Sequence, residues 1–131
     1  MKTKEEMEHD LAGFFGTEAY HPLADGVVMT DGADYLHKNG LAPVMDEIAS
    51  AQPAITKDGA PDAELLRDIQ FWTLAAEAGG FLLTCRGDTG REIVHSRKFV
   101  DLEFPLPAVE LYCAPAGEPT TPQVILLPSE Y

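Results

Sequence analysis

The sequence predicts an α+β domain in which N-terminal helices pack on a four- to five-stranded antiparallel β-meander. Segments with helical periodicity come first, over about 3–66, and segments with strand-like alternation follow, over about 68–131. A length of 131 residues suits one domain, and a chain of this size buries roughly two-thirds of its unfolded surface. We therefore expect a single domain over 1–131, with a helical part followed by a sheet part.

The first element expected is a helix from Thr3 to Gly16. Thr3 and Glu6 have the spacing of a capping box, in which each side chain accepts a hydrogen bond from the backbone N–H of the other residue. Glycine suits the left-handed conformation that commonly ends a helix. One face of this helix is apolar and contains Met7, Leu11, Phe14 and Phe15.

A loop containing Pro22 and Gly26 is expected next, followed by a short strand at 27–29. Thr30 or Asp31 can then cap a second helix, because both side chains accept hydrogen bonds from free backbone N–H groups. An Asn-Gly pair ends that helix, since both residues tolerate the conformation that stops helical winding.

A third helix is expected from Pro43 to Pro53, because proline fits a first helical turn and disrupts a helix interior. The connector over 53–63 is rich in Pro, Gly, Ala and Asp and is expected to be exposed. The segment 62–77 fits either a helix or a strand. We favour a helical turn near Leu65 and then a strand, since the residues that follow are typical of a hairpin.

Four further strands are expected at 81–86 and 92–99, around a turn at 87–90, and at 109–113 and 123–127. The last of them contains four consecutive apolar residues. Such a run is typical of a strand that is buried on both faces, so we expect this strand at the centre of the sheet.

The formal charge is −13, from 22 acidic and 9 basic side chains, and residues 1–68 carry 14 of the acidic and 5 of the basic ones. This imbalance disfavours direct binding to nucleic acid or to an anionic membrane and favours a basic protein partner. The charged start does not resemble a secretory signal, and no apolar run has the length of a membrane span. A cytoplasmic protein with reduced Cys85 and Cys113 is therefore expected.

No catalytic residue, cofactor or metal site is predicted. A Cys-His dyad needs neighbouring side chains, but the expected hairpin register places Cys85 opposite Glu92 and Leu82 opposite His95. Cys85 and His95 then lie on opposite faces, unless a β-bulge shifts the register. The four histidines are scattered without metal-ligand spacing, and the sequence has no glycine-rich phosphate-binding motif.

Acidic side chains are the candidates for contact with a partner. The candidate partner-binding residues are Asp31, Asp34, Asp46, Glu47, Asp101, Glu103 and Glu130. Asp31 also fits a helix cap, and an exposed edge of the sheet equally explains Asp101 and Glu103. Glu130 and Tyr131 form either a recognition tag or the structural end of a buried strand, with the ring of Tyr131 packed on the core.

Several short segments carry a resemblance to known proteins. They are Phe15-Gly16-Thr17-Glu18, Thr30-Asp31-Gly32 with Tyr35-Leu36, Asp46-Glu47-Ile48-Ala49, Phe104-Pro105-Leu106 and Leu126-Leu127-Pro128-Ser129-Glu130-Tyr131. In this order, and over nearly the whole chain, they resemble a family of small uncharacterised bacterial proteins, a domain of unknown function. The final Leu-Leu-Pro-Ser-Glu-Tyr motif is the most specific part, and Pro43 departs from the family pattern. The resemblance implies one intact domain and an accessory role in bacteria and their mobile genetic elements, without catalytic residues.

Three functions are compatible with these observations. We favour a non-enzymatic acidic protein that docks on a basic protein surface, such as an inhibitor of a nucleic-acid-processing enzyme of the anti-restriction or anti-CRISPR type. The alternatives are a small enzyme or ligand-binding domain with a pocket between helices and sheet, and an accessory domain whose charge only keeps it dispersed. The pocket of the second alternative would be lined by Trp72, Tyr35, Tyr112 and Phe104, with Asp101 or His95 as its polar group.

Overall fold

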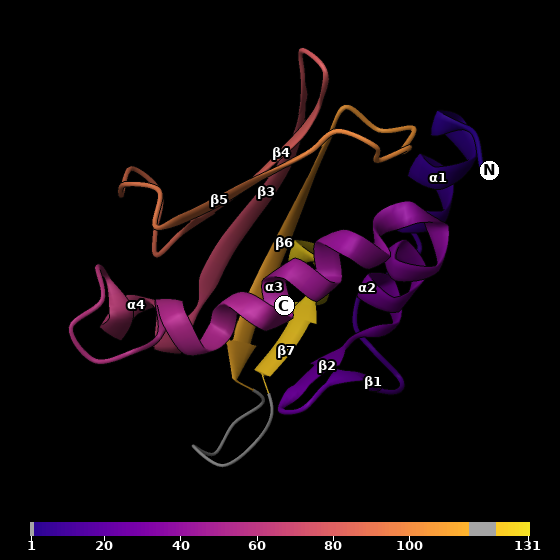
Figure 1. The fold of residues 1–131 in the computed structure, drawn as a ribbon. Helices are drawn as coiled ribbons and strands as arrows, with labels where there is room; N and C mark the ends of the chain where they lie inside the picture. Colours follow the sequence, from indigo (N-terminus) through magenta and orange to yellow (C-terminus); the bar gives the residue numbers. More distant parts are fainter. Residues whose placement is uncertain (1, 116–122) are drawn as a thin grey trace.

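The computed structural model describes residues 2–115 and 123–131. Within these residues, seven strands form one mostly antiparallel sheet in the order β1-β2-β7-β6-β3-β4-β5 (Figure 1). The strands are β1 (His21–Ala24), β2 (Val27–Met29), β3 (Gln70–Glu77), β4 (Gly80–Arg86), β5 (His95–Phe99), β6 (Ala108–Pro115) and β7 (Gln123–Leu126). The mixed α and β class is confirmed, but the sheet is larger than the four to five strands expected.

The longest of the described helices, α3, crosses one face of this sheet, and α2 lies beside β7 (Figure 1). The helical elements are α1 (Lys4–Leu11), α2 (Asp31–Leu36), the π-helical turn η1 (His37–Leu41), α3 (Ala42–Ile55), α4 (Ala63–Asp68) and the 3₁₀ turn η2 (Pro128–Glu130). The segment 62–77, for which helix and strand were both open, contains α4 and then β3, as favoured from the sequence.

The expected antiparallel meander is wrong at the N-terminal side of the sheet. There β2 pairs in parallel with β7, so that Val28 lies opposite Val124. β1 occupies the segment expected to be a loop and pairs with β2 through a turn in which Gly26 has φ +74°. The helical part of the chain therefore contributes a hairpin. The strand at 27–29 was expected, but the hairpin was not predicted, because strands this short have little periodicity.

Helix starts were predicted more accurately than helix ends. The capping box at Thr3 is formed, and both of its hydrogen bonds are 3.1 Å long. However, α1 ends at Leu11 instead of Gly16, and Phe14 packs its ring 5.6 Å from that of Tyr35. Phe14 is therefore packed although it follows the helix, whereas Phe15, which was expected on the same apolar face, is 81% exposed.

In the second and third helices, only the predicted end of α3 differs from the structure. Thr30 caps α2 through its hydroxyl, and Gly40, with φ +112°, interrupts the helical path as expected. Pro53 does not end α3 but lies inside its last turn. The helix closes after it, because the backbone N–H and the hydroxyl of Thr56 both donate to the carbonyl of Gln52, at 3.2 and 2.7 Å.

The register predicted for the hairpin of β4 and β5 is wrong. Cys85 lies opposite His95 rather than Glu92, and β5 begins at His95 rather than at residue 92. Residues 87–93 form a wider connection than a four-residue turn, and the N–H of Val94 donates to the carbonyl of Cys85 at 2.9 Å. As a consequence, Cys85 and His95 share one face of the sheet.

The core lies between α3 and the sheet. Its largest fully buried side chains include Met45, Ile48, Trp72, Leu74, Leu83, Leu111 and Ile125. β7 is an interior strand of the sheet, and its apolar residues 124–126 are buried, as expected. Two buried amides, Gln52 and Gln70, bond each other at 2.6 and 2.8 Å, and the indole N–H of Trp72 donates to Gln70 at 2.9 Å. These bonds satisfy polar groups that burial would otherwise make costly.

Candidate functional site

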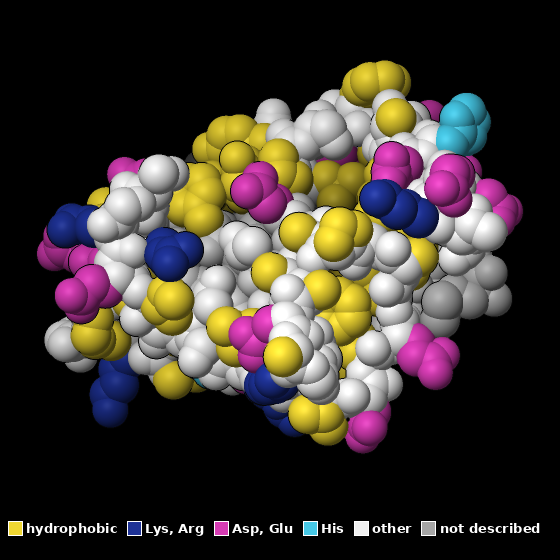
Figure 2. Space-filling model, turned by 90° about the horizontal axis from the view of Figure 1, so that it is seen from above, with side chains coloured by type: hydrophobic (Ala, Val, Ile, Leu, Met, Phe, Trp, Pro, Cys, Tyr) yellow, Lys and Arg dark blue, Asp and Glu magenta, His cyan; other side chains and the backbone are white. Residues whose placement is uncertain are grey.

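The seven acidic candidates do not form one cluster. Asp46, Asp101 and Glu103 are exposed, whereas the other four take part in hydrogen bonds or ion pairs within the chain. Figure 2 shows acidic side chains dispersed over one view of the surface, several of them beside Lys or Arg. The negative charge is therefore diffuse rather than concentrated in a single patch.

Asp31 and Asp34 are joined to β1 through a histidine. The Nε2 atom of His21 lies 2.8 Å from Asp31, and its Nδ1 atom lies 3.6 Å from Asp34. Lys38 also pairs with Asp34, at 2.8 Å. The backbone N–H of Glu18 and then His21 hold the pKa of Asp31 below its ordinary value. These carboxylates fix α2 against the N-terminal hairpin.

Glu130 is used within the fold. Its Oε2 atom accepts the backbone N–H of Gly32 at 2.9 Å, and its Oε1 atom accepts the hydroxyl of Thr30 at 2.6 Å and the N–H of Leu127 at 2.9 Å. A Cβ atom at Gly32 would lie only 2.7 Å from this carboxylate. The ring of Tyr131 packs 5.7 Å from that of Tyr112 but remains 76% exposed. The structure therefore supports the structural interpretation for Glu130, but the expectation that the ring of Tyr131 packs on the core is wrong.

Glu47 is the centre of the densest group of titratable side chains. It projects from α3 toward β5, where Oε2 lies 2.7 Å from Nε2 of His95 and Oε1 accepts from Arg97 at 2.5 Å. Only 11% of the Glu47 side chain is exposed. Burial raises the pKa of this carboxyl, but Arg97 and His95 together outweigh burial and leave the pKa below its ordinary value.

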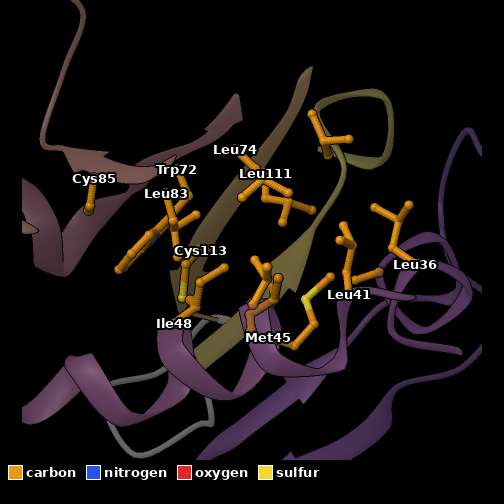
Figure 3. Packing of buried hydrophobic residues seen from close by; sticks show 14 of the residues in the cluster. Leu36, Leu41, Met45, Ile48, Trp72, Leu74, Leu83, Cys85, Leu111 and Cys113 are labelled. Carbon is orange, nitrogen blue, oxygen red and sulfur yellow. The ribbon is translucent and has the colours of Figure 1, made fainter. Parts of the chain in front are cut away.

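Cys85 is on the same face as His95, yet the pair does not have the features of a nucleophile and its base. Within the described chain, no hydrogen bond joins them, and the histidine nitrogen that is bonded faces Glu47. Burial raises the pKa of both Cys85 and Cys113 to about 12, so the reactive thiolate is suppressed near neutral pH. Both thiols are buried, and Figure 3 shows Cys113 beside Ile48 of α3.

The aromatic residues proposed for a pocket between helices and sheet do not meet. Trp72 is 1% exposed and belongs to the core, whereas Tyr112 is on the other face of the sheet. Tyr35 donates its hydroxyl to Asp10 at 2.5 Å, and Phe104 packs 6.4 Å from Phe81. In residues 2–115 and 123–131, no group of three or more His, Cys, Asp or Glu side chains could hold a metal ion.

Sequence reasoning missed His95 and Arg97 as partners of Glu47. They lie 48 and 50 residues away along the chain, so no local spacing connects them.

None of the described helices is long and apolar enough to cross a membrane.

Comparison with known proteins gives one match. A family model with the description "Family of unknown function (DUF6876)" matches residues 5–131. No curated protein and no solved structure matches the chain at a significant level. The expected resemblance to a family of unknown function is thereby confirmed, and the match covers nearly the whole chain.

Proposed function

The chain belongs to the DUF6876 family of unknown function, and from this premise we propose that it is a non-enzymatic acidic protein that docks on a basic protein surface. The observation that carries the proposal is the charge: twenty-two carboxylates against nine Lys and Arg residues leave thirteen without a one-to-one partner. A field of this sign attracts basic proteins and repels nucleic acid.

The exposed carboxylates near the start of α3 are the best candidates for the docking surface. Asp101 and Pro43 line one surface hollow of about 250 Å³, and Asp46 follows Pro43 by one helical turn. The backbone of Glu103 passes next to Gly40, just before α3. Val100, between these elements, is 68% exposed. We call Asp46, Val100, Asp101 and Glu103 the acidic surface.

Nearby basic side chains are engaged with other carboxylates. Arg97 pairs with Glu47 at 2.5 Å, and Lys98 pairs with Glu77 at 3.0 Å. The acidic surface thus keeps its charge, and the apolar side chain of Val100 adds area that a partner can bury.

The partner class that fits is an enzyme with a basic nucleic-acid-binding cleft, which would make this chain an inhibitor of the anti-restriction or anti-CRISPR type in the cytoplasm. The dispersed carboxylates favour long-range attraction, which mainly accelerates association, over a shape-matched copy of a duplex. A salt-sensitive association rate is the expected signature of such docking.

The test compares two triple variants with the same net charge. D46N/D101N/E103Q removes the acidic surface, and D25N/E64Q/D68N removes three exposed carboxylates elsewhere; each changes the formal charge from −13 to −10. Each immobilised protein is exposed to host-cell lysate, and retained proteins are identified and their salt elution measured. We expect a basic protein that the wild type and the second variant retain and that the first variant loses.

Equal loss by both variants would show that only net charge matters and would contradict a localised acidic surface. Retention that does not weaken at high salt, or the absence of any basic protein among those retained, would contradict the proposed function itself.

A further inference from the structure

The sheet has a second face that the described helices leave uncovered. Along β3 and β4, buried side chains alternate with half-buried ones, and the buried set faces α3. The other set, together with its neighbours on β6, we call the open face. It consists of Phe71, Thr73, Leu82, Thr84, Arg86, Glu110 and Tyr112.

A row of aromatic rings lies on the open face. The rings of Phe71 and Tyr112 meet edge to face at 5.1 Å, and Tyr131 continues the row 5.7 Å beyond Tyr112. Beside the row is a hollow of about 220 Å³, lined by Phe71, Arg86, Glu110 and Tyr112 among others. This volume is below the range of about 300–1,000 Å³ that is typical of small-molecule sites, so side chains of a protein partner suit it better.

The open face is nearly neutral although the whole chain is strongly acidic. Its side chains on β3, β4 and β6 named above include one cation, Arg86, and one anion, Glu110. Asp88 of the following loop lines the same hollow, and Lys98, opposite Leu82 on β5, pairs with Glu77 at 3.0 Å. In the described part of the chain, Arg86 has no carboxylate and Glu110 has no basic nitrogen within 4.0 Å; the Nε atom of Arg86 donates to the carbonyl of Arg91 at 3.1 Å. A surface of this composition does not select a basic partner.

The strand register places these two charges on either side of β3. β3 lies between β4 and β6, with Phe71 opposite Arg86 on one side and Thr73 opposite Glu110 on the other. The midpoint between Arg86 and Glu110 therefore falls on β3, between Phe71 and Thr73. A two-fold axis that passes over this point, in the plane between two apposed faces and perpendicular to the line from Arg86 to Glu110, brings Arg86 of each copy against Glu110 of the other.

We infer that two copies of this chain associate through their open faces as a two-fold symmetric dimer. Each patch is complementary to itself, as a two-fold interface requires. The aromatic row forms the centre, where rings bury large areas, and two Arg86–Glu110 pairs flank it. The inference is independent of the acidic surface, which lies at the start of α3.

Charge exchange between the two copies tests this dimer. R86E and E110R each place like charges against each other at both ion pairs, so each variant alone is expected to shift to the monomer mass in sedimentation velocity at physiological salt. In an equimolar mixture, a dimer with one copy of each variant has opposite charges at both ion pairs, and the dimer mass is expected to return. K57E and E92R make the same charge changes at exposed positions outside the open face and should leave the dimer intact.

A wild type that sediments as a monomer up to high micromolar concentration would overturn the inference and leave the open face to a different protein. It would also be overturned if R86E or E110R stayed dimeric, or if their mixture stayed monomeric while circular dichroism showed both variants folded. Recovery of the dimer only on mixing would support this interface over any other.

Discussion

Glu47 shows how one carboxylate joins two elements that are distant in the sequence. Its two oxygens contact His95 and Arg97 on β5, and the side chain is nearly buried on α3. A buried carboxylate with both oxygens engaged favours its ionised form, and the lowered pKa of Glu47 expresses this preference.

The pH dependence of folding follows from that lowered pKa. The unfolded chain binds this proton more tightly than the native protein does, so the contribution of Glu47 is present above the ordinary carboxyl pKa of about 4.3 and is lost as pH falls through the native value. E47Q is expected to lower the free energy of unfolding by about 1–3 kcal/mol at neutral pH and to flatten its decline in acid. Urea unfolding between neutral and acid pH measures both effects.

D46N is the matched control for E47Q, because Asp46 is the exposed neighbour on the same helix. It should keep the pH profile of the wild type. An unchanged profile in E47Q would mean that the contacts to His95 and Arg97 do not set the pKa of this carboxyl.

Single residues were predictable where their partners are close in sequence. The capping box of Thr3 and Glu6 spans three residues, and its spacing alone identified it. The partners of Glu130 include Gly32, which is 98 residues away, so its role depends on how β7 and α2 meet. No spacing rule contains that information.

At the scale of elements, periodicity identified the central strands but not the register between them. β4 has large apolar side chains on both faces, Leu82 on one and Leu83 on the other. A one-sided apolar pattern fixes register because a slip would expose it, and this strand lacks such a pattern. The width of the connection after Arg86 then decided the pairing.

The requirement for glycine at the turn between β3 and β4 can be tested by substitution. Gly80 has φ +155°, and a Cβ atom there would lie 2.2 Å from the carbonyl oxygen of Phe99 on β5. G80A must therefore separate two paired strands, and we expect it to lower the free energy of unfolding by more than about 3 kcal/mol. Denaturant unfolding of the variant measures this loss.

The matched control for G80A is G79A, at the adjacent position. Gly79 has φ +82°, but a Cβ atom added there would have as its nearest neighbour the flexible Nζ of Lys98, at 3.8 Å. Only the backbone conformation is then unfavourable, at a cost of about 1 kcal/mol. Equal losses in the two variants would show that the approach of Phe99 is not what requires glycine at position 80.

At the scale of the whole molecule, the excess of carboxylates acts against folding as well as on partners. Like charges repel within a compact body, and salt weakens this repulsion because the Debye length falls from about 30 Å at 0.01 M to about 10 Å at 0.1 M. We expect the melting temperature at neutral pH to rise by a few degrees over this range, as measured by circular dichroism.

The same salt titration near the pI of about 4.4 is the control, because the net charge vanishes there and the rise should disappear. A melting temperature that falls with salt at neutral pH would mean that ion pairs such as Glu47–Arg97 outweigh the general repulsion.

The class of fold and the sign of the surface charge were readable from composition and periodicity, because both are sums over many residues. The arrangement of the strands in the sheet could not be predicted in this way. The number of strands and the parallel pairing of β2 with β7 depend on contacts between segments about a hundred residues apart, which no local pattern encodes. For the same reason, the sequence named seven candidate carboxylates but could not separate the three exposed ones from the four that bond within the chain.

The position of β7 between β2 and β6 also affects when this protein can fold during its synthesis. The hairpin of β1 and β2 is synthesised about a hundred residues before β7, which is its only strand partner outside the hairpin in the described sheet. A nascent chain that stops before residue 123 leaves that hairpin and the edge of β6 without their neighbour. Completion of this sheet must therefore wait until β7 has been synthesised.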